Sequence, residues 1–242
     1  MNQTNKLIMP STSTVLGQKD SHIHWLTENI GIHHQAVQDY QAMQKAALNE
    51  QIKIHIISGF RSFERQLHIW NNKYLAKLPV KDQAGQCLDM AKLSEKEKVE
   101  AILLFSALPG ASRHHWGSDI DVYDPRALSN QQRLQLEPWE YSETGPFFTL
   151  SQWLQQHSQE FGFYFPYDSY RGGVAAEPWH LSYQPLAQRY QQSLTIDVLA
   201  SRLSEVNIQG KTSILKHIEE IYEKYIINVN PVNQLIGKNT YG

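Results

Sequence analysis

The stretch SRHHWGSDID, from Ser112 to Asp121, is the most informative part of this sequence. It places two histidines, two aspartates and a glycine within ten residues. Histidine and aspartate side chains are common metal ligands when several of them converge on one point. Gly117 allows the chain to turn between a loop histidine and a strand aspartate. His114 and Asp121, seven positions apart, can therefore face one point, and a third donor must come from a distant segment.

The residues next to this stretch predict the elements that hold it. Pro109-Gly110 breaks the chain immediately before it, so the stretch begins in a loop. Residues 119–123 then alternate between apolar and polar side chains, which predicts a strand that ends at Pro125. One face of this strand is unusually acidic, because it carries both Asp119 and Asp121.

Further elements are expected on both sides. The isoleucines of residues 52–56 alternate with polar residues up to Ser58-Gly59, which predicts a strand. Ser62 stands where the N-cap of a following helix belongs. Apolar spacing near the helical period predicts helices over residues 30–48, 63–78, 94–108, 148–162 and 212–229.

The composition fits one ordinary globular domain. A chain of 242 residues, 41% of them apolar, can bury a sizeable core. We expect a polar N-terminal extension over residues 1–25, the main domain over 26–190 and a helical C-terminal extension over 191–242. A formal net charge of -2 provides no basic field for phosphate backbones, so no nucleic-acid partner is expected.

The sequence also predicts a cytoplasmic location. It shows neither a signal-peptide core nor an apolar run of about 18 residues, so no membrane association is expected. The lone Cys87 excludes an intramolecular disulfide framework, which agrees with a reducing compartment, and this thiol is expected to have no catalytic role.

The short motif EPWH, Glu177 to His180, offers the missing donor. Pro178 biases Glu177 toward extended or polyproline geometry, and a period of three residues then places Glu177 and His180 on the same side of the backbone. His114, Asp121 and His180 together could form a catalytic zinc site with one coordination position left for water. A carboxylate beside such a ligand is well placed to deprotonate the water.

Three motifs in order resemble those of the VanY-type D-alanyl-D-alanine carboxypeptidases. These zinc peptidases share a fold with lysostaphin-type endopeptidases and the hedgehog amino-terminal domain, and their patterns are S-G-Y-R-S-x-x-x-Q, S-x-H-x-x-G-x-A-x-D and E-x-W-H. The matching residues here are Ser58 to Ser62 with Gln66, then Ser112, His114, Gly117 and Asp121, then Glu177, Trp179 and His180.

The resemblance implies a fold and a set of roles. The fold is an α+β domain in which a central antiparallel sheet carries the zinc ligands and helices pack outside. One zinc ion would be bound by His114, Asp121 and His180, with Glu177 as the catalytic base. Arg61 would pair with the terminal carboxylate of the substrate or with the developing oxyanion, while Gln66 and Ser112 would help to hold the substrate.

Two positions depart from the family pattern. Phe60 replaces the usual tyrosine, and Asp119 replaces a small residue. Asp119 shares a strand face with Asp121, so it could orient a ligand histidine, bind a substrate ammonium or lie solvated at the rim. We favour the first of these roles and also count Asp119 among the substrate-binding candidates.

Other histidines have simpler interpretations. His115 competes with His114 as a ligand, but only His114 has the spacing of the pattern. His55 alternates within a strand and is expected to be structural. The histidines expected at the surface are His22, His24, His33, His34, His68, His157 and His217.

The resemblance implies release of C-terminal D-alanine from peptides derived from peptidoglycan. A cytoplasmic enzyme would meet recycled murein peptides, which favours L,D-carboxypeptidase action on a tetrapeptide, releasing D-alanine after meso-diaminopimelate. The alternatives are D,D-cleavage of pentapeptide or dipeptide ends, endopeptidase action within the stem peptide, and a zinc-binding module without catalysis. The sequence leaves the oligomeric state open, and other divalent ions could replace zinc.

Overall fold

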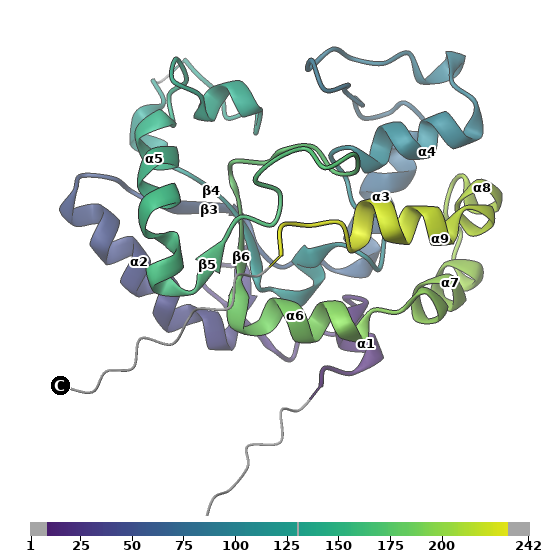
Figure 1. The fold of residues 1–242 in the computed structure, drawn as a ribbon, viewed down its shortest axis with the longest axis horizontal. Coiled ribbons are helices and arrows are strands. Elements are labelled where there is room, and N and C mark those ends of the chain that lie inside the picture. Colours follow the sequence, from purple (N-terminus) through teal and green to yellow (C-terminus); the bar gives the residue numbers. More distant parts are fainter. Residues whose placement is uncertain (1–8, 130, 232–242) are drawn as a thin grey trace, which may run out of the picture.

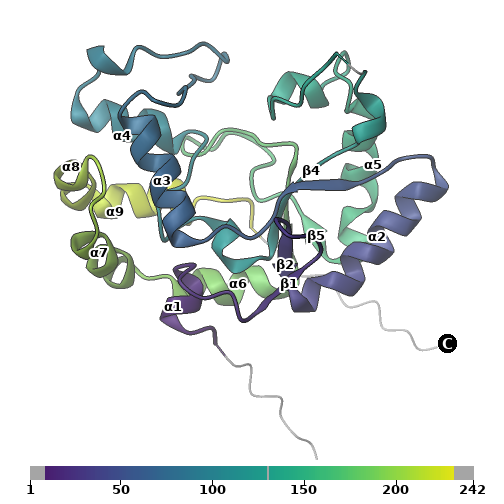
Figure 2. The same cartoon turned by 180° about the vertical axis from the view of Figure 1, so that it is seen from behind.

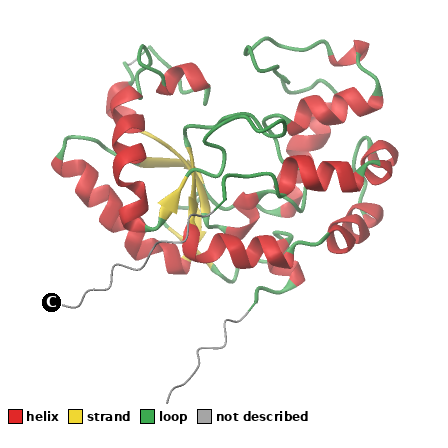
Figure 3. Cartoon of the chain, in the orientation of Figure 1, coloured by secondary structure: helices red, strands yellow, loops and turns green. Residues whose placement is uncertain are grey.

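The centre of the molecule is a four-stranded antiparallel sheet with the order β3-β4-β6-β5 (Figure 1). The strands are β3 (His55–Ser58), β4 (Asp119–Tyr123), β5 (Phe163–Tyr164) and β6 (His180–Tyr183). This computed structural model describes residues 9–129 and 131–231. Helices flank the sheet (Figure 3), so the predicted α+β class with a central antiparallel sheet is confirmed.

Two groups of helices lie on opposite sides of the sheet (Figure 1). One side carries α2 (Val37–Asn49) and α5 (Phe148–His157). The other side carries α3 (Phe63–Tyr74) and α4 (Glu95–Leu103). The remaining helices are α1 (Thr12–Val15), α6 (Gln184–Ser193), α7 (Ile196–Glu205), α8 (Lys211–Lys216) and α9 (Ile218–Ile221).

Local sequence explains where β3 and α3 begin. Ile52, Ile54 and Ile56 are buried while the residues between them are exposed, as the alternation predicted. The Ser62 side chain accepts a hydrogen bond from the backbone N–H of Arg65 at 3.2 Å, so it is the N-cap of α3. The loop between β3 and α3 is therefore fixed at both ends, and it carries the first motif.

The prediction of a helix over residues 30–48 is wrong for its first third, residues 30–36. Gly31–His33 forms β2, which pairs with β1 (Ile23–Trp25), and helix α2 starts only at Val37. The Gly31 carbonyl accepts from the Phe60 N–H at 2.7 Å, and the His33 N–H donates to the Gly117 carbonyl at 2.7 Å. These backbone contacts with the two motifs favour an extended segment over the helix that the side-chain pattern alone indicated.

The C-terminal helices share the hydrophobic core of the sheet. Leu199, Leu203 and Ile214 are fully buried in the same apolar cluster as Val15 of α1 and the sheet isoleucine Ile120. The helix predicted over 212–229 is divided into α8, α9 and a π-helical turn over Tyr222–Ile226. The division at residues 25 and 190 stays a prediction, and residues 1–8 and 232–242 of the two expected extensions lie outside the described residues.

Within residues 9–129 and 131–231, every helix is too short or too polar to cross a bilayer.

Two histidines expected at the surface are buried instead. His22 is 8% exposed and His33 is 4% exposed, because the β1–β2 hairpin packs against α6 (Figure 2). Their rings contact each other and Tyr190 of that helix. The Nδ1 atom of His33 accepts a hydrogen bond from the Gln35 N–H at 3.1 Å, so this ring is neutral in the folded chain.

His33 should therefore make stability depend on pH. Burial, with charge repulsion from His22, His34 and Arg189, lowers the pKa of His33 to about 3. In the unfolded chain a histidine binds its proton near pH 6.5, so the free energy of unfolding falls by up to about 1.4 kcal/mol per pH unit as the pH drops from about 6.5 toward 3. A His33→Asn variant, which keeps a cap acceptor, should lose close to one proton from this dependence, measured by urea unfolding at several pH values.

The control is His24→Asn, because His24 is exposed on β1. Its unfolding free energy should follow the wild-type pH dependence. If the pH dependence of His33→Asn were also that of the wild type, His33 would not be the titrating group.

Candidate metal centre and active site

Two of the predicted metal ligands lie directly opposite each other in the sheet. Asp121 of β4 pairs with His180 of β6, and Ser58 of β3 is its partner on the other side. Directly opposite residues of an antiparallel pair have side chains about 4.5–5.5 Å apart on one face. The antiparallel register therefore brings together two motifs that are 59 positions apart in the sequence.

The third predicted ligand, His114, lies in the short helix η3 (Arg113–Trp116), which ends at Gly117. Gly117 has φ +67°, and a Cβ atom at this position would lie 2.3 Å from Ile23 Cδ1 and 2.9 Å from the His33 backbone nitrogen. Only glycine fits this left-handed turn against β2. The turn carries the chain from η3 into β4, so that His114 and Asp121 face the same point.

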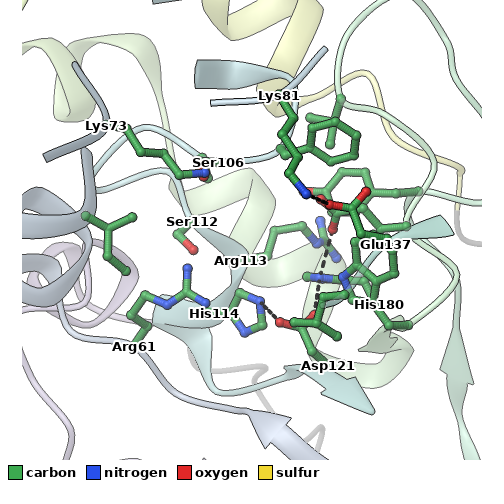
Figure 4. Close-up of a pocket in the computed structure, with 18 of the residues that line it drawn as sticks. Arg61, Lys73, Lys81, Ser106, Ser112, Arg113, His114, Asp121, Glu137 and His180 are labelled. Carbon is green, nitrogen blue, oxygen red and sulfur yellow. Dashed lines mark hydrogen bonds and ion pairs between the residues drawn. The ribbon is translucent and has the colours of Figure 1, made fainter. Parts of the chain in front are cut away.

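The three donor side chains point toward one another (Figure 4). One ligand atom from each of His114, Asp121 and His180 lies within 4.8 Å of the others. His114 Nε2 is 3.3 Å from Asp121 Oδ2, and His180 Nδ1 is 3.1 Å from Asp121 Oδ1. Asp121 Oδ1 is buried without a hydrogen-bond partner among the described residues, as expected of an atom that binds a metal.

The other ring nitrogens are held by partners that fix the tautomers. His114 Nδ1 donates toward the carbonyl oxygens of Gly59 at 3.0 Å and Asp119 at 3.1 Å, which leaves Nε2 for a metal. His180 Nε2 donates to Asp119 Oδ1 at 3.0 Å, which leaves Nδ1. Two neutral imidazoles and one carboxylate with such partners fit zinc and leave a coordination position open.

The charges of the cluster match this arrangement. Burial lowers the pKa of His114, which favours its neutral form. Burial opposes ionisation of Asp121, but His114 and His180 outweigh it and hold the pKa of Asp121 well below its usual range. Burial also disfavours the charged form of His180, but the neighbouring carboxylates of Asp119 and Asp121 raise its pKa to about 10. A metal ion would therefore displace a proton from His180.

Glu177 lies beside the ligands but belongs to none of the sheet strands. It precedes β6, and its carbonyl accepts from the His180 N–H at 3.1 Å. Its carboxylate Oε2 is 3.4 Å from His180 Nδ1, and the residue is 7% exposed. Burial raises the pKa of Glu177 to about 8, so this carboxyl group is poised to exchange a proton.

The cluster forms part of the lining of a pocket of about 310 Å³. Arg61, Ser112 and Glu177, three of the residues predicted to act on the substrate, also line it. Ser112 is 1% exposed and lies in the pocket lining. This volume suits the end of a short peptide.

Gln66, predicted to help hold the substrate, lies behind the pocket wall and reaches the pocket through Arg61. Its side chain is fully buried; Oε1 accepts from Arg61 Nη1 at 2.8 Å, and Nε2 donates to the Ala107 carbonyl at 2.6 Å. Ser58 Oγ accepts from Arg61 Nη2 at 2.9 Å. Two residues of the first motif therefore orient the guanidinium that faces the pocket.

His115 also supports this arginine instead of binding a metal. Its Nδ1 donates to the Arg61 carbonyl at 2.6 Å, and its Nε2 accepts from the Gly110 N–H at 3.0 Å. Both ring nitrogens are thus used by backbone groups, which agrees with the assignment of His114 as the ligand.

Asp119 is also placed differently from its predicted contact with a substrate. It is 0% exposed and is not among the residues that line the pocket. Its carboxylate accepts hydrogen bonds from Arg113 Nε at 2.7 Å and from His180 Nε2 at 3.0 Å. The serine hydroxyl groups of Ser118 and Ser182 donate to the other oxygen. Of the three roles considered from the sequence, this geometry matches the orientation of a ligand histidine.

Several residues that line the pocket belong to none of the three motifs and were not predicted from the sequence. Lys73 of α3 donates to Ser106 Oγ at 2.6 Å inside the pocket lining. Lys81 and Glu137 form an ion pair in the same lining. The ring of Tyr167 lies 5.0 Å from that of His180. These residues come from helices and loops without a fixed spacing to the motifs, so the sequence alone gave no signal for them.

Two known proteins are similar to this chain in sequence. An uncharacterized protein of Haemophilus influenzae is 40% identical over 122 residues, which are 50% of this chain and 93% of that protein. The putative carboxypeptidase YodJ of Bacillus subtilis is 26% identical over 155 residues, 63% of this chain and 46% of that protein. Both relatives match only part of the present chain.

A solved structure shares the fold. VanYB in complex with D-alanine-D-alanine is 23% identical, with a TM-score of 0.51 over 78% of this chain and 92% of that chain. The family model described as VanY, D-alanyl-D-alanine carboxypeptidase, matches residues 29–186, a range that contains all three motifs. The resemblance seen in the sequence is confirmed, and the chain belongs to the VanY family of D-alanyl-D-alanine carboxypeptidases.

Proposed function

We propose that this protein is a zinc-dependent carboxypeptidase that releases C-terminal D-alanine from peptides derived from peptidoglycan, as an L,D-carboxypeptidase on the murein tetrapeptide. One observation carries the proposal. The cluster of His114, Asp121 and His180 lies in one pocket with the buried carboxyl group of Glu177 and with the cation Arg61. A metal, a base and an anion-binding group are the parts that a metallocarboxypeptidase needs.

Each residue has a chemical task in this proposal. Zinc bound by the three ligands would polarise the scissile carbonyl and lower the pKa of water to about 7. Glu177 takes a proton from the attacking water and gives it to the amine of the departing residue. Arg61 offers donors to a carboxylate or to the oxyanion, and its orientation by Gln66 and Ser58 reduces the cost of this contact.

The preference for the tetrapeptide is supported at the other end of the pocket. In a murein tetrapeptide the residue before the scissile bond is meso-diaminopimelate, whose side chain ends in an ammonium and a carboxylate. Lys81 and Glu137, a matching pair of opposite charges, lie near His180 and away from Arg61 (Figure 4). If Lys81 paired with the substrate carboxylate and Glu137 paired with the substrate ammonium, each of the four charges would still have a partner of opposite sign. This pair replaces Asp119 as the contact proposed for the ammonium.

The test is a mass-spectrometric assay of the purified, zinc-loaded protein. The substrates are murein tetrapeptide and pentapeptide, free and attached to disaccharide, and a tetrapeptide with lysine in place of diaminopimelate. We expect release of D-alanine from the diaminopimelate tetrapeptide, slower release from the lysine peptide, and complete loss of activity when the metal is chelated and its return when zinc is added.

Other outcomes would select the other functions. Loss of D-alanine from only the pentapeptide would establish D,D-carboxypeptidase activity instead. Cleavage inside the stem peptide would favour an endopeptidase. If the zinc-loaded protein cleaved none of these substrates, the binding-module alternative would replace the enzyme.

A further inference from the structure

The pocket contains two cations whose charge no carboxylate of the described residues balances through an ion pair. Seven charged residues line it: Arg61, Lys73, Lys81, Arg113, Asp121, Glu137 and Glu177. Lys81 pairs with Glu137, and Arg113 pairs with Asp119 behind the wall. Asp121 belongs to the cluster of metal donors, and the Glu177 carboxylate lies 3.4 Å from His180 of that cluster. Arg61 and Lys73 are left, and within residues 9–129 and 131–231 neither forms an ion pair.

Arg61 has been given a role by its motif, but Lys73 has not. Lys73 lies in the last turn of α3 and points toward Ser106, on the same side of the metal ligands as Arg61 (Figure 4). Ser112 lies between the two cations in this view. The ammonium donates one hydrogen bond, to Ser106 Oγ at 2.6 Å, and an ammonium has three donors. It therefore keeps donors for a ligand in the pocket.

The position of a half-buried ammonium without an ion pair requires an explanation. Burial lowers the pKa of Lys73, because removing a charge from water is costly. A serine hydroxyl group alone does not balance a charge. A packing role would be met by methionine or leucine, whereas an ammonium beside Arg61 and two hydroxyl groups forms a site suited to an anion.

We propose that Lys73 binds the C-terminal carboxylate of the departing residue, with Ser106 as its orienting partner. This inference rests on the proposed carboxypeptidase function and adds a residue outside the three motifs. The backbone N–H of Arg61 donates to the carbonyl of the ligand His114 at 3.1 Å, and the Arg61 guanidinium lies next to His114 in Figure 4, whereas Lys73 lies farther from it. Arg61 is then available to the carbonyl oxygen at the scissile bond while Lys73 fixes the end of the chain.

The proposal explains how the pocket would select the end of a peptide. A free terminal carboxylate would satisfy Lys73, whereas a continuing peptide would place an uncharged amide against this half-buried ammonium. The loss of such a charged hydrogen bond costs about 1.5–3 kcal/mol, and the pocket would therefore prefer a free carboxylate by roughly 10–100-fold. Exopeptidase action would follow from this one contact.

The test compares two ligands in two proteins. Equilibrium binding of the tetrapeptide and of its C-terminal carboxamide is measured by calorimetry, in zinc-loaded Glu177→Gln protein so that no turnover occurs, with and without Lys73→Met. We expect a preference for the acid of at least roughly tenfold when Lys73 is present and a preference reduced by roughly tenfold in the Lys73→Met protein. Binding of the carboxamide should change little.

Controls separate this role from a structural one. Lys77→Met removes an exposed lysine just beyond α3 and should leave both affinities unchanged. Ser106→Ala removes the hydrogen bond of Lys73 but not its charge, so most of the preference for the acid should remain. If Lys73→Met weakened acid and amide equally, or left the preference unchanged, Lys73 would not hold the carboxylate.

A second variant covers the case in which methionine disturbs folding. Lys73→Gln retains a donor for Ser106 without the charge, and zinc content and circular dichroism verify that each protein is intact. If the wild type cleaved the peptide but its preference for the free acid over the carboxamide did not depend on Lys73, this inference alone would be overturned. Failure of the wild type to cleave any peptide would overturn the proposed function.

Discussion

Replacement of Glu177 by glutamine should reduce kcat on the D-alanine-releasing reaction by about 10²–10⁴-fold while zinc stays bound. The amide retains the size and hydrogen-bonding ability of the carboxyl group but cannot accept the proton of the attacking water. Glu177 is 7% exposed, and its carboxylate lies 3.4 Å from His180 Nδ1. Of the other carboxylates that line the pocket, Asp121 is a predicted ligand and Glu137 is paired with Lys81. Steady-state kinetics, with the zinc content of each preparation, measure the effect.

The matched control is Glu143→Gln, because Glu143 is an exposed glutamate of the surface. It should have wild-type kinetics. A Glu177→Gln protein with full activity would exclude Glu177 as the base. A protein that lost zinc together with its activity would show that Glu177 acts as a ligand instead.

The metal cluster could be predicted from the sequence because its geometry depends on local features. Gly117 sets the turn from His114 into β4, and the alternation along that strand places Asp121 on the pocket face. The contribution of His180 required the strand register, which no short pattern specifies. The resemblance to a family grouped His180 with His114 and Asp121, which local periodicity could not do.

The supporting residues could not be predicted in the same way. Gln66 and Asp119 lie in motifs whose other residues line the pocket. Tertiary packing nevertheless buries both side chains behind the pocket wall. In the sequence Lys73 is one polar residue of a predicted helix, and only the approach of Ser106 after α4 makes it part of a pocket. The helix period specifies which positions share a face but not which other segment that face meets.

Asp119 connects the metal site to the core through a buried ion pair. Its carboxylate lies between His180 Nε2 at 3.0 Å and Arg113 Nε at 2.7 Å. The remaining guanidinium donors of Arg113 bind Gln191, Tyr164 and Ser182, and the group lies over the ring of Trp116. Both charged side chains are almost fully buried, so each depends on the other for its charge balance.

Replacement of Asp119 by alanine should therefore affect both stability and metal binding. An uncompensated buried Arg113 should reduce the free energy of unfolding by about 3–5 kcal/mol, and His180 without its carboxylate partner should bind zinc roughly 10–100-fold more weakly. The Arg113→Met, Asp119→Ala double variant removes both charges and should recover most of the stability but not the zinc affinity. Urea unfolding and chelator competition measure the two quantities. If the double variant regained zinc affinity together with stability, Asp119 would serve only to neutralise Arg113, and the orientation of His180 would come from the sheet alone.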